Sequence, residues 1–301
     1  MKLAVVGSIN ADISVTAERI PQKGETVRGS SVSTSPGGKG ANQAVAMARL
    51  GADVEMFGCV GDDENGRKML ENLRQEGVGI SHVCVLKGVP TGMAMITVGE
   101  SDNTVVIVAG ANQMVNQAYV EVIKEQLKAY DLVVLQQEIP LDAVYDVIDF
   151  CWENQIPVIL NPAPAAAVPM EIVDKATYLT PNEHEAKLIF GEQTEMDALL
   201  RQYPEKLIIT QGEKGVSVCR KSGEILNVPA RKSTVVDTTG AGDTLNGAFA
   251  VRIAAGDDIE SALRYANIAA GLSVEKSGAQ GGMPTNAEVE AAALYWRNPI
   301  K

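Results

Sequence analysis

Short apolar runs alternate with amphipathic stretches along most of this chain of 301 residues. The apolar runs are LAVVG (3–7), VEMFGCVG (54–61), DLVVLQ (131–136), IPVILN (156–161), YLT (178–180) and KLIITQG (206–212). Between most of them the hydrophobic spacing predicts helices, at about residues 41–50, 64–76, 116–129, 141–154 and 182–190. This alternation predicts an α/β fold with a mostly parallel central sheet and helices on both faces.

Two segments break the alternation. Residues 11–36 alternate in polarity and contain Pro21, Gly24 and Gly29. Residues 91–109 read as two alternating runs joined by the turn-forming sequence GESDN. We expect the two segments to form a small β-sheet that protrudes from the main one. Because the sequence has no internal repeat or long linker, residues 1–301 are predicted to form one domain with this protrusion.

The composition restricts the classes of partner. Acidic residues outnumber basic ones by 38 to 26, and the net charge of −12 argues against a nucleic-acid or anionic membrane surface. The four cysteines are far apart and form no CxxC pair, which suits a reducing compartment. No apolar run reaches transmembrane length, and the first one is too short for a signal-peptide core. We therefore expect a cytoplasmic protein.

Polar clusters follow several of the predicted strands. In open parallel sheets ligands bind beyond the carboxyl ends of the strands, so these clusters are candidate binding residues. They are Asn10 with Asp12, Glu138, NPAPA (161–165), PNEHEA (181–186) and QGEKG (211–215). Helix caps and turns explain any one of them taken alone, but their number on one edge predicts a site there.

A glycine-rich turn, SPGGKGANQA (35–44), precedes the first predicted helix. It does not match the Walker pattern, because Gly40 rather than Ser or Thr follows Lys39, and it does not match GxGxxG. The sequence therefore argues against a nicotinamide enzyme. What remains is a loop whose backbone can approach a ligand closely, with Lys39 and Asn42 suited to binding hydroxyl groups.

A second glycine-rich turn, VVDTTGAGDTLNGAF (235–249), also opens a helix. Backbone N–H groups at a helix start attract anions, so Gly240, Ala241 and Gly242 are predicted to form an anion hole. Asp243 follows them, close enough to accept a proton from a hydroxyl that attacks a bound phosphoryl group. The pattern predicts phosphoryl transfer with Asp243 as the general base. The structural alternative is a simple Asp cap on the helix.

Together these motifs resemble the ribokinase-like carbohydrate kinases. The resemblance rests on GSINAD (7–12), GGKGANQA (37–44), VGDDENG (60–66), NPAPA, TPNEHEA (180–186) and DTTGAGDTLNG (237–247), and it runs in register from about residue 3 to residue 284. It implies ATP-dependent phosphorylation of D-ribose at the 5-hydroxyl, with Mg²⁺ and a monovalent cation such as K⁺. It also implies a β-sheet lid over the sugar, formed by residues 11–36 and 91–109, and a homodimer that packs two lids together.

The resemblance assigns roles to individual residues of this chain. The sugar hydroxyls would be held by Asn10, Asp12, Gly38, Lys39, Asn42 and Glu138. ATP would be held by Asn182, Thr210, Gly212, Gly215, Gly242 and Asn267. Hydrated Mg²⁺ would be positioned by Glu185, and the cation would be bound by Asp237, Thr239, Ser273, Lys276, Gly278 and Gly282. The family tends to carry a small hydroxyl residue where this chain has Gly282, so a side-chain ligand is missing there.

Other functions stay open at this point. The acceptor is ribose in the preferred interpretation, and 2-deoxyribose, another sugar or a nucleoside in the alternatives. A nucleoside kinase is disfavoured because only 4% of the residues are aromatic, and such an enzyme needs apolar or aromatic side chains to pack against the nucleobase. A non-catalytic sugar sensor on the same scaffold is also disfavoured, because both the base and the glycines of the anion hole are intact.

Overall fold

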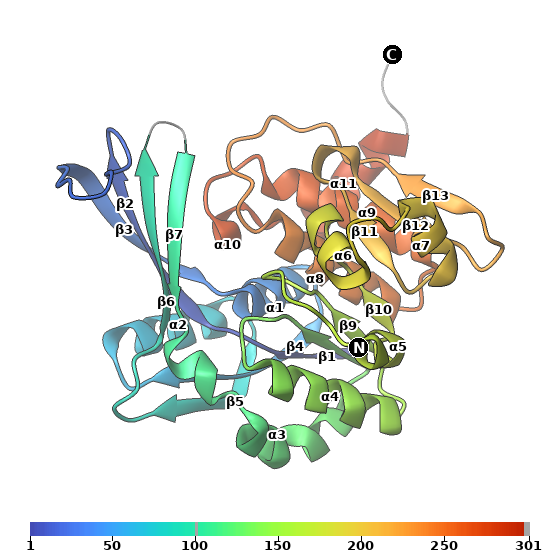
Figure 1. Ribbon diagram of the computed structural model, residues 1–301, viewed down its shortest axis with the longest axis horizontal. Coiled ribbons are helices and arrows are strands. Elements are labelled where there is room, and N and C mark those ends of the chain that lie inside the picture. Colours follow the sequence, from blue (N-terminus) through green and yellow to red (C-terminus); the bar gives the residue numbers. More distant parts are fainter. Residues whose placement is uncertain (100–101, 298–301) are drawn as a thin grey trace.

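The computed structural model describes residues 1–99 and 102–297, and six parallel strands form its centre (Figure 1). Their order in the sheet is β10-β9-β8-β1-β4-β5. The strands are β1 (Lys2–Val6), β4 (Asp53–Gly61), β5 (Gly79–Leu86), β8 (Leu132–Leu135), β9 (Val158–Leu160) and β10 (Tyr178–Leu179). The predicted α/β fold with a mostly parallel sheet is confirmed. The strand β5 lies in GISHVCVL, which the sequence analysis did not assign to a strand.

Helices cover both faces of this sheet, as expected from its apolar strands. Alternate residues of β1 point to opposite faces, so Leu3 and Val5 join one hydrophobic core while Ala4 and Val6 join the other. The first core is closed by α1 (Lys39–Arg49), α2 (Glu64–Gln75), α8 (Ala241–Ala254), α9 (Ile259–Ser273) and α11 (Asn286–Arg297). The second is closed by α3 (Gln117–Ile123), α4 (Leu141–Glu153), α5 (Met170–Lys175), α6 (Glu183–Phe190) and α7 (Met196–Gln202).

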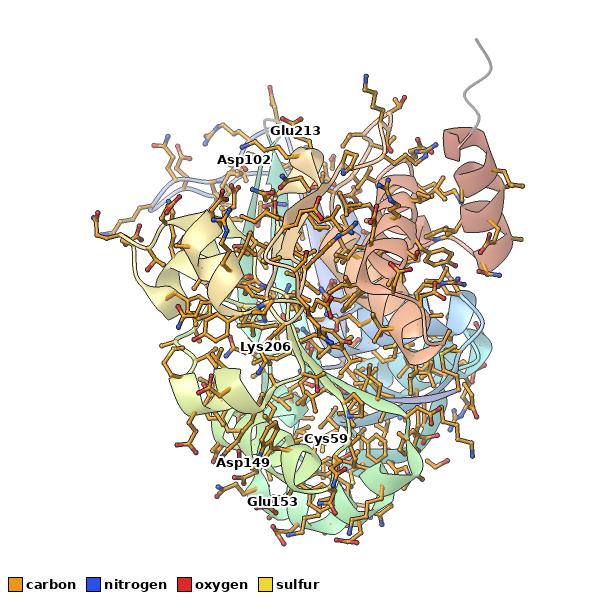
Figure 2. All side chains as sticks on the ribbon, turned by 90° about the vertical axis from the view of Figure 1, so that its right-hand side faces the viewer. Cys59, Asp102, Asp149, Glu153, Lys206 and Glu213 are labelled. Carbon is orange, nitrogen blue, oxygen red and sulfur yellow. The ribbon has the colours of Figure 1, made fainter. Side chains whose placement is uncertain are left out.

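The side chains follow the same division between core and solvent (Figure 2). Cys59 of β4 is only 1% exposed and lies within the second core, whereas Glu153 at the end of α4 is exposed. The four cysteines are all free thiols. No helix in the described part of the chain is long and apolar enough to cross a membrane.

The run at 206–212 differs from its prediction as a member of the main sheet. Its strand β11 (Ile208–Thr210) starts a separate three-stranded antiparallel sheet with β12 (Val216–Cys219) and β13 (Ile225–Val228). Only two isolated parallel bridges, Leu179 with Leu207 and Asn182 with Thr210, continue the main sheet toward it. All three residues of β11 pair with β12 in antiparallel register, and this pairing assigns the strand to the smaller sheet.

The predicted helix at 116–129 is also divided in the structure. Its α-helical part ends at Ile123, and residues Lys124–Ala129 continue as a 3-10 helix, η2. Two further 3-10 turns are η1 (Gly110–Met114) and η3 (Gly212–Lys214), and the short helix α10 (Ala279–Gly282) follows α9.

The two segments that break the alternation form a separate four-stranded sheet, as predicted. Its order is β3-β2-β6-β7, built from β2 (Asn10–Ala17), β3 (Gly29–Gly37), β6 (Gly92–Gly99) and β7 (Asp102–Val108). The strands β2 and β6 pair in parallel and the outer pairs are antiparallel. The sheet stands upright beside the helical half that contains α8 to α10 (Figure 1). The middle of the expected GESDN turn, residues 100 and 101, lies outside the described residues.

Candidate active site

Asp243 is the third residue of α8, and a left-handed glycine sets the start of that helix. Gly240 caps α8 with φ of 78°, a conformation that favours glycine. A Cβ atom on Gly240 would also lie 2.9 Å from Ala279 Cα. Both requirements exclude other residues and fix the turn that leads into the helix. The Asp243 side chain is thereby placed at the buried edge of the turn, with 6% of its surface exposed.

The N–H groups at the start of α8 are the candidate anion donors. First-turn N–H groups have no acceptor within their own helix. The N–H of Ala241 donates to the Thr238 carbonyl at 3.2 Å, so it is already engaged. Gly242 faces open space, because a Cβ atom there would meet nothing within 4 Å. The N–H groups of Gly240, Gly242 and Asp243 are therefore better placed to bind an anion than the N–H group of Ala241, which already has an acceptor.

Both oxygens of the Asp243 carboxylate accept hydrogen bonds from α1. Asn42 Nδ2 donates to Asp243 Oδ2 at 2.9 Å, and Gln43 Nε2 donates to Asp243 Oδ1 at 3.0 Å. Two neutral amide donors hold one rotamer of the carboxylate. Each oxygen keeps a second lone pair that can accept a proton.

Gln43 is a site residue that the sequence analysis missed. It is fully buried, and its amide also donates to Asn161 Oδ1 at 3.1 Å while accepting from Gln136 Nε2 at 2.7 Å. The network joins α1 to the ends of β8 and β9. The signal in the sequence was its place beside Asn42 in GGKGANQA and the asparagine that opens NPAPA.

Asp12 lies within β2 rather than in a loop after the first strand. Its Oδ1 is buried and has no hydrogen-bond partner among the described residues. Burial, with the nearby charges of Glu138 and Asp243, raises the pKa of Asp12 to about 6. A Cβ atom on Gly37 would lie 2.1 Å from Asp12 Oδ2, so the glycine-rich loop packs directly on this carboxylate. A hydroxyl donor from a ligand would satisfy the unpartnered oxygen.

Lys39 stands among carboxylates from several elements. Burial alone would lower the pKa of Lys39, but the charges of Asp243, Glu138 and Glu185 outweigh it and raise the pKa. Glu138 Oε2 accepts from the Lys39 N–H at 3.0 Å and from Ser8 Oγ at 2.6 Å. The predicted sugar side and the predicted nucleotide side therefore meet around one ammonium group.

Two further predicted sugar residues occupy the same region. Asn10 is buried, and its Oδ1 accepts from Asn112 Nδ2 at 2.7 Å. Asn112 also receives the Ile9 N–H at 2.9 Å and was not identified from the sequence. Gly38 caps α1 with φ of 87°, and a Cβ atom there would lie 2.8 Å from the Asn10 nitrogen.

The predicted nucleotide residues come from α6, the three-stranded sheet and α9. Asn182 and Glu185 form a capping box at the start of α6, with both hydrogen bonds at 2.8 Å. Asn182 and Thr210 form an isolated parallel β-bridge through their backbones. Gly215 has φ of 99° and packs on the backbone of residues 228–230, where Asn267 Nδ2 donates to the Val228 and Pro229 carbonyls at 2.9 and 3.2 Å.

The predicted cation residues fall into two contacting groups. Asp237 accepts from the Thr239 N–H at 2.9 Å and from the Gly278 N–H at 2.8 Å. Burial would raise the pKa of Asp237, but these hydrogen bonds outweigh it and lower the pKa, which favours the carboxylate.

Ser273 and Gly282 form the second group. A Cβ atom on Gly282 would lie 2.1 Å from the Ser273 carbonyl oxygen. Glycine is therefore required by this backbone, and the carbonyl takes the space that a hydroxyl side chain would use. Lys276 contributes only backbone here, because its ammonium pairs with Glu288 at 3.3 Å.

Glu185 is the one carboxylate predicted to act on Mg²⁺. It is 7% exposed, and its burial raises its pKa, while the Asn182 N–H and the Lys39 charge oppose the shift. Within residues 1–99 and 102–297 there is no group of three or more His, Cys, Asp or Glu side chains that could hold a metal. A single carboxylate suits Mg²⁺ that keeps its waters and binds phosphate oxygens.

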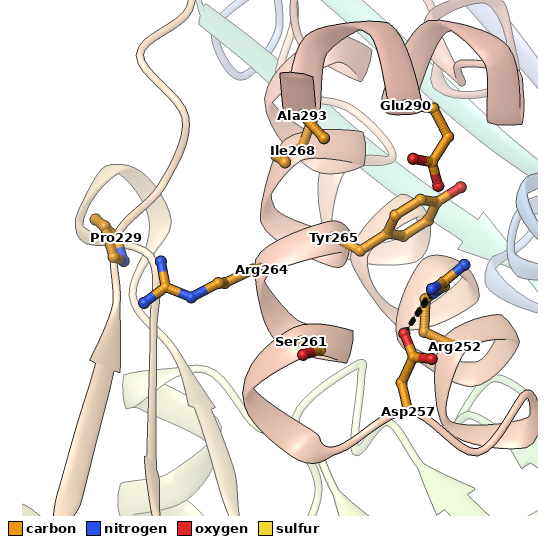
Figure 3. Close-up of a pocket in the computed structure, with 9 residues that line it drawn as sticks. All are labelled: Pro229, Arg252, Asp257, Ser261, Arg264, Tyr265, Ile268, Glu290 and Ala293. Carbon is orange, nitrogen blue, oxygen red and sulfur yellow. Dashed lines mark hydrogen bonds and ion pairs between the residues drawn. The ribbon is translucent and has the colours of Figure 1, made fainter. Parts of the chain in front are cut away.

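A cavity of about 440 Å³ lies elsewhere, between the far end of α8, α9 and α11 (Figure 3). Two of the lining residues, Arg252 and Asp257, form an ion pair at 2.7 Å, and the lining residue Arg264 pairs with Glu260 at 2.6 Å. Arg252 is nine residues after Asp243, which is about 14 Å along the helix. This cavity is separate from the cluster around Asp243.

Comparison with known proteins agrees with this arrangement. The model of the pfkB family carbohydrate kinases matches residues 1–286. The chain is 51% identical over 288 residues to a ribokinase of Bacillus subtilis, covering 96% of this chain and 98% of the relative. It is 35% identical to a deoxyribokinase of Salmonella typhi, covering 95% of this chain and 96% of that one. The solved structure of Arabidopsis thaliana ribokinase complexed with ribose and ATP has a TM-score of 0.89 at 33% identity, covering 96% of this chain and 97% of that one.

Proposed function

This chain belongs to the pfkB family of carbohydrate kinases, and from that premise we propose that it transfers the γ-phosphoryl group of ATP to the 5-hydroxyl of D-ribose. The products are ribose 5-phosphate and ADP. The 51% identity to a ribokinase supports this substrate pair, as does the likeness to a ribokinase solved with ribose and ATP.

One observation carries the proposal. Asp243 is buried, held in one rotamer by Asn42 and Gln43, and placed directly after the helix start that presents N–H groups to an anion. A simple cap would use the carboxylate to accept the N–H groups of its own helix. Here the carboxylate instead accepts amides from α1, and its helix start is left for a ligand.

Asp243 acts as the general base in this proposal. The 5-hydroxyl donates its proton to an Asp243 oxygen while its own oxygen attacks the γ-phosphorus, and the bond to the ADP leaving group breaks. The N–H groups at the start of α8 stabilise the negative charge of the group in transfer. Lys39, whose charge interacts with that of Asp243, adds a positive charge to the same region.

The sugar residues are assigned by the chemistry of hydroxyl recognition. Asp12 has an unpartnered carboxylate oxygen, and Asn42 keeps a second amide hydrogen. We assign these two side chains to the 2- and 3-hydroxyls of ribose. Asn10, Gly38, Lys39 and Glu138 complete the contacts to the sugar.

The nucleotide would lie along Asn182, Thr210, Gly212, Gly215 and Asn267, with its phosphates at Gly242. A Cβ atom on Gly242 would meet nothing within 4 Å, so the backbone there is open to approach by a phosphate group. Mg²⁺ would be held through its waters by Glu185, and when bound it neutralises charge on the phosphates. Glu185 fits that role because one of its oxygens is left free by the capping box.

A monovalent cation, K⁺ in our proposal, would bind in the loop of Asp237 and Gly278. The ligands there are oxygens, namely the Asp237 carboxylate and backbone carbonyls at Thr239, Ser273, Lys276, Gly278 and Gly282. A Cβ atom on Gly282 would lie only 2.1 Å from the Ser273 carbonyl oxygen. This supports a backbone ligand from Ser273 in place of a hydroxyl side chain at position 282. Such a cation would lie beside the anion hole and strengthen its positive potential.

We name the four-stranded sheet of β2, β3, β6 and β7 the lid. We propose that residues 1–301 form a single domain with this lid, which residues 11–36 and 91–109 would provide, and that closing the lid over the sugar excludes water from the phosphoryl group. Its strand β7 is exposed along its whole length, including Val105, Val106, Ile107 and Val108. An exposed apolar edge strand supports a homodimer that packs two lids together. The free cysteines support a cytoplasmic location.

A coupled assay of ADP release tests the activity across pentoses, hexoses and nucleosides, each with and without K⁺. Ribose is expected to give the highest kcat/KM. A clear preference for 2-deoxyribose would favour the second candidate, which the 35% identity to a deoxyribokinase makes the main competitor. Ribose binding without ADP release from any acceptor would support a sugar sensor instead.

A further inference from the structure

Four side chains form a directional chain of hydrogen bonds that ends on the catalytic carboxylate. Asn72 Nδ2 of α2 donates to Gln280 Oε1 at 2.8 Å, and Gln280 Nε2 donates to Asn42 Oδ1 at 3.0 Å. Asn42 Nδ2 in turn donates to Asp243 Oδ2 at 2.9 Å. Gln280 accepts from Asn72 and donates to Asn42, and Asn42 in turn donates to Asp243. The orientation of each amide therefore fixes the orientation of the next.

Gln280 is the link of this chain that lies on α10, a helix of four residues, and it is 5% exposed. The same short helix packs on the anion-hole turn through Ala279 and is capped by Gly278, whose N–H donates to Asp237. The Arg49 guanidinium of α1 donates to the Gln280 and Met283 carbonyls, which fixes the α10 backbone against α1.

The Asn42 amide has two orientations that differ by exchange of its oxygen and nitrogen. Only the one observed lets it donate to Asp243 and still present a second hydrogen to a sugar hydroxyl. Gln280 donates to the oxygen of Asn42 and therefore supports that orientation from the opposite side. Neither the family comparison nor the assigned site residues give Gln280 a role.

We propose that Gln280 is a positioning residue that holds the Asn42 amide in its sugar-binding orientation and ties it to the turn of the anion hole. The inference rests on the sugar kinase activity proposed above. Because α10 contacts both the anion-hole turn and the Asn42 amide, it couples the position of the turn to the orientation of that amide. Loss of the Gln280 amide is expected to weaken sugar binding more than it slows the chemical step.

The change Gln280→Glu makes the orientation itself testable. When ionised, the introduced carboxylate would attract Asn42 Nδ2, so it would compete with the Asp243 carboxylate for one amide nitrogen. It also could not donate to Asn42 Oδ1, as the glutamine does. This substitution should therefore weaken sugar binding more than removal of the Gln280 amide does.

The experiment is calorimetric titration of ribose into the wild type, Gln280→Ala, Gln280→Met and Gln280→Glu at one pH near neutrality. We expect Gln280→Ala and Gln280→Met to raise the Kd by about tenfold, the scale of one lost hydrogen bond. Gln280→Glu should raise the Kd further, because the introduced carboxylate competes with Asp243 for Asn42 Nδ2.

Steady-state kinetics give the second measurement, with KM for ribose rising more than kcat falls. Gln75→Glu is the matched control, because Gln75 is exposed on α2 and the change adds the same charge outside the site. Unfolding temperatures identify a variant that fails to fold, and the isosteric Gln280→Met then decides. Wild-type binding of ribose with an unchanged Kd in Gln280→Ala and Gln280→Met would overturn this inference alone. Absence of ribose binding by the wild type would overturn the proposed function.

Discussion

Asn42 Nδ2 donates to Asp243 Oδ2 at 2.9 Å, joining two residues that are 201 positions apart in the chain. The bond connects the glycine-rich loop of the sugar side to the glycine-rich turn of the phosphate side. It places the group proposed to accept the proton beside the group proposed to hold the sugar. The packing of α1 on α8 thus sets the distance between these two side chains.

Replacing Asp243 with asparagine removes the proton acceptor and keeps the shape of the side chain. We expect Asp243→Asn to lower kcat by about a hundredfold or more while ribose and ATP still bind. ADP release gives kcat, and calorimetry gives the two dissociation constants. Asp257→Asn, the same change just beyond the far end of α8, is the control and should keep its turnover. Full activity in Asp243→Asn would exclude Asp243 as the base.

Gln43 holds the other oxygen of the same carboxylate from a fully buried position. The change Gln43→Leu removes that donor and leaves the polar groups of Asn161 and Gln136 without it. Each buried unsatisfied group costs about 1–3 kcal/mol, so a fall of several degrees in Tm is expected. We also expect kcat to fall by about tenfold, because the carboxylate loses a defined rotamer. Gln202→Leu, on an exposed residue, is the control for both measurements, and equal behaviour of the two variants would contradict the role given to Gln43.

The sequence allowed the fold class and the location of the lid to be predicted, because both follow from local periodicity. The strand β5 was missed because GISHVCVL is half-exposed and lacks a continuous apolar run. The position of β11 was predicted wrongly for a different reason. Its apolar run is typical of a central strand, but its main partner, β12, comes later in the chain and runs antiparallel to it.

The site shows the same limit of local patterns. Asp243, Asn42 and Lys39 lie in glycine-rich motifs, so their spacing alone marked them as candidates. Gln43 lies beside Asn42 in the same motif, but neither it nor Gln280 was identified, since a glutamine on a helix is more often a solvated residue than a buried donor. Only the packing of α1 against α8 and α10 shows that these two amides are buried and point at site residues.

Asp12 carries a cost in stability that a variant can measure. Its pKa is raised to about 6 from an ordinary 3.8, because burial and the charges of Glu138 and Asp243 disfavour the carboxylate. The folded state therefore binds this proton more tightly than the unfolded chain. The free energy of unfolding falls as pH rises from about 4 to about 6, and the full cost is present above that range.

Asp12→Asn should remove this cost. We expect the free energy of unfolding to rise by about 1–3 kcal/mol at about pH 7.5, with no gain at about pH 4. Ribose binding should weaken, because the amide presents only one acceptor atom to the hydroxyls. Denaturant unfolding at the two pH values gives the stability, and Asp62→Asn, on an exposed aspartate, is the control. An equal gain at both pH values would show that the ionisation of Asp12 is not the cause.

Gly282 tests whether a hydroxyl ligand can be restored to the proposed cation loop. A Cβ atom there would lie 2.1 Å from the Ser273 carbonyl oxygen, so Gly282→Ser must displace α10 or the end of α9. We expect Tm to fall, with a loss of about 1–3 kcal/mol, and activation by K⁺ to weaken rather than strengthen. Gly281→Ser is the control, because a Cβ atom on Gly281 meets nothing within 4 Å. Stronger K⁺ activation in Gly282→Ser with unchanged Tm would contradict the proposed backbone ligand.

The strand β7 tests the proposed dimer of lids. Val105, Val106 and Ile107 are 50%, 63% and 50% exposed on an edge strand, and a second copy would cover them. A carboxylate in that interface would lose its water without gaining a partner, so Val106→Asp is expected to convert a wild-type dimer into monomers. Light scattering after size-exclusion chromatography measures the mass. Val122→Asp is the matched control, because Val122 is 71% exposed on α3, outside the lid, and should remain dimeric. A wild-type chain that elutes as a monomer, or a dimer that survives Val106→Asp, would place the contact between copies elsewhere.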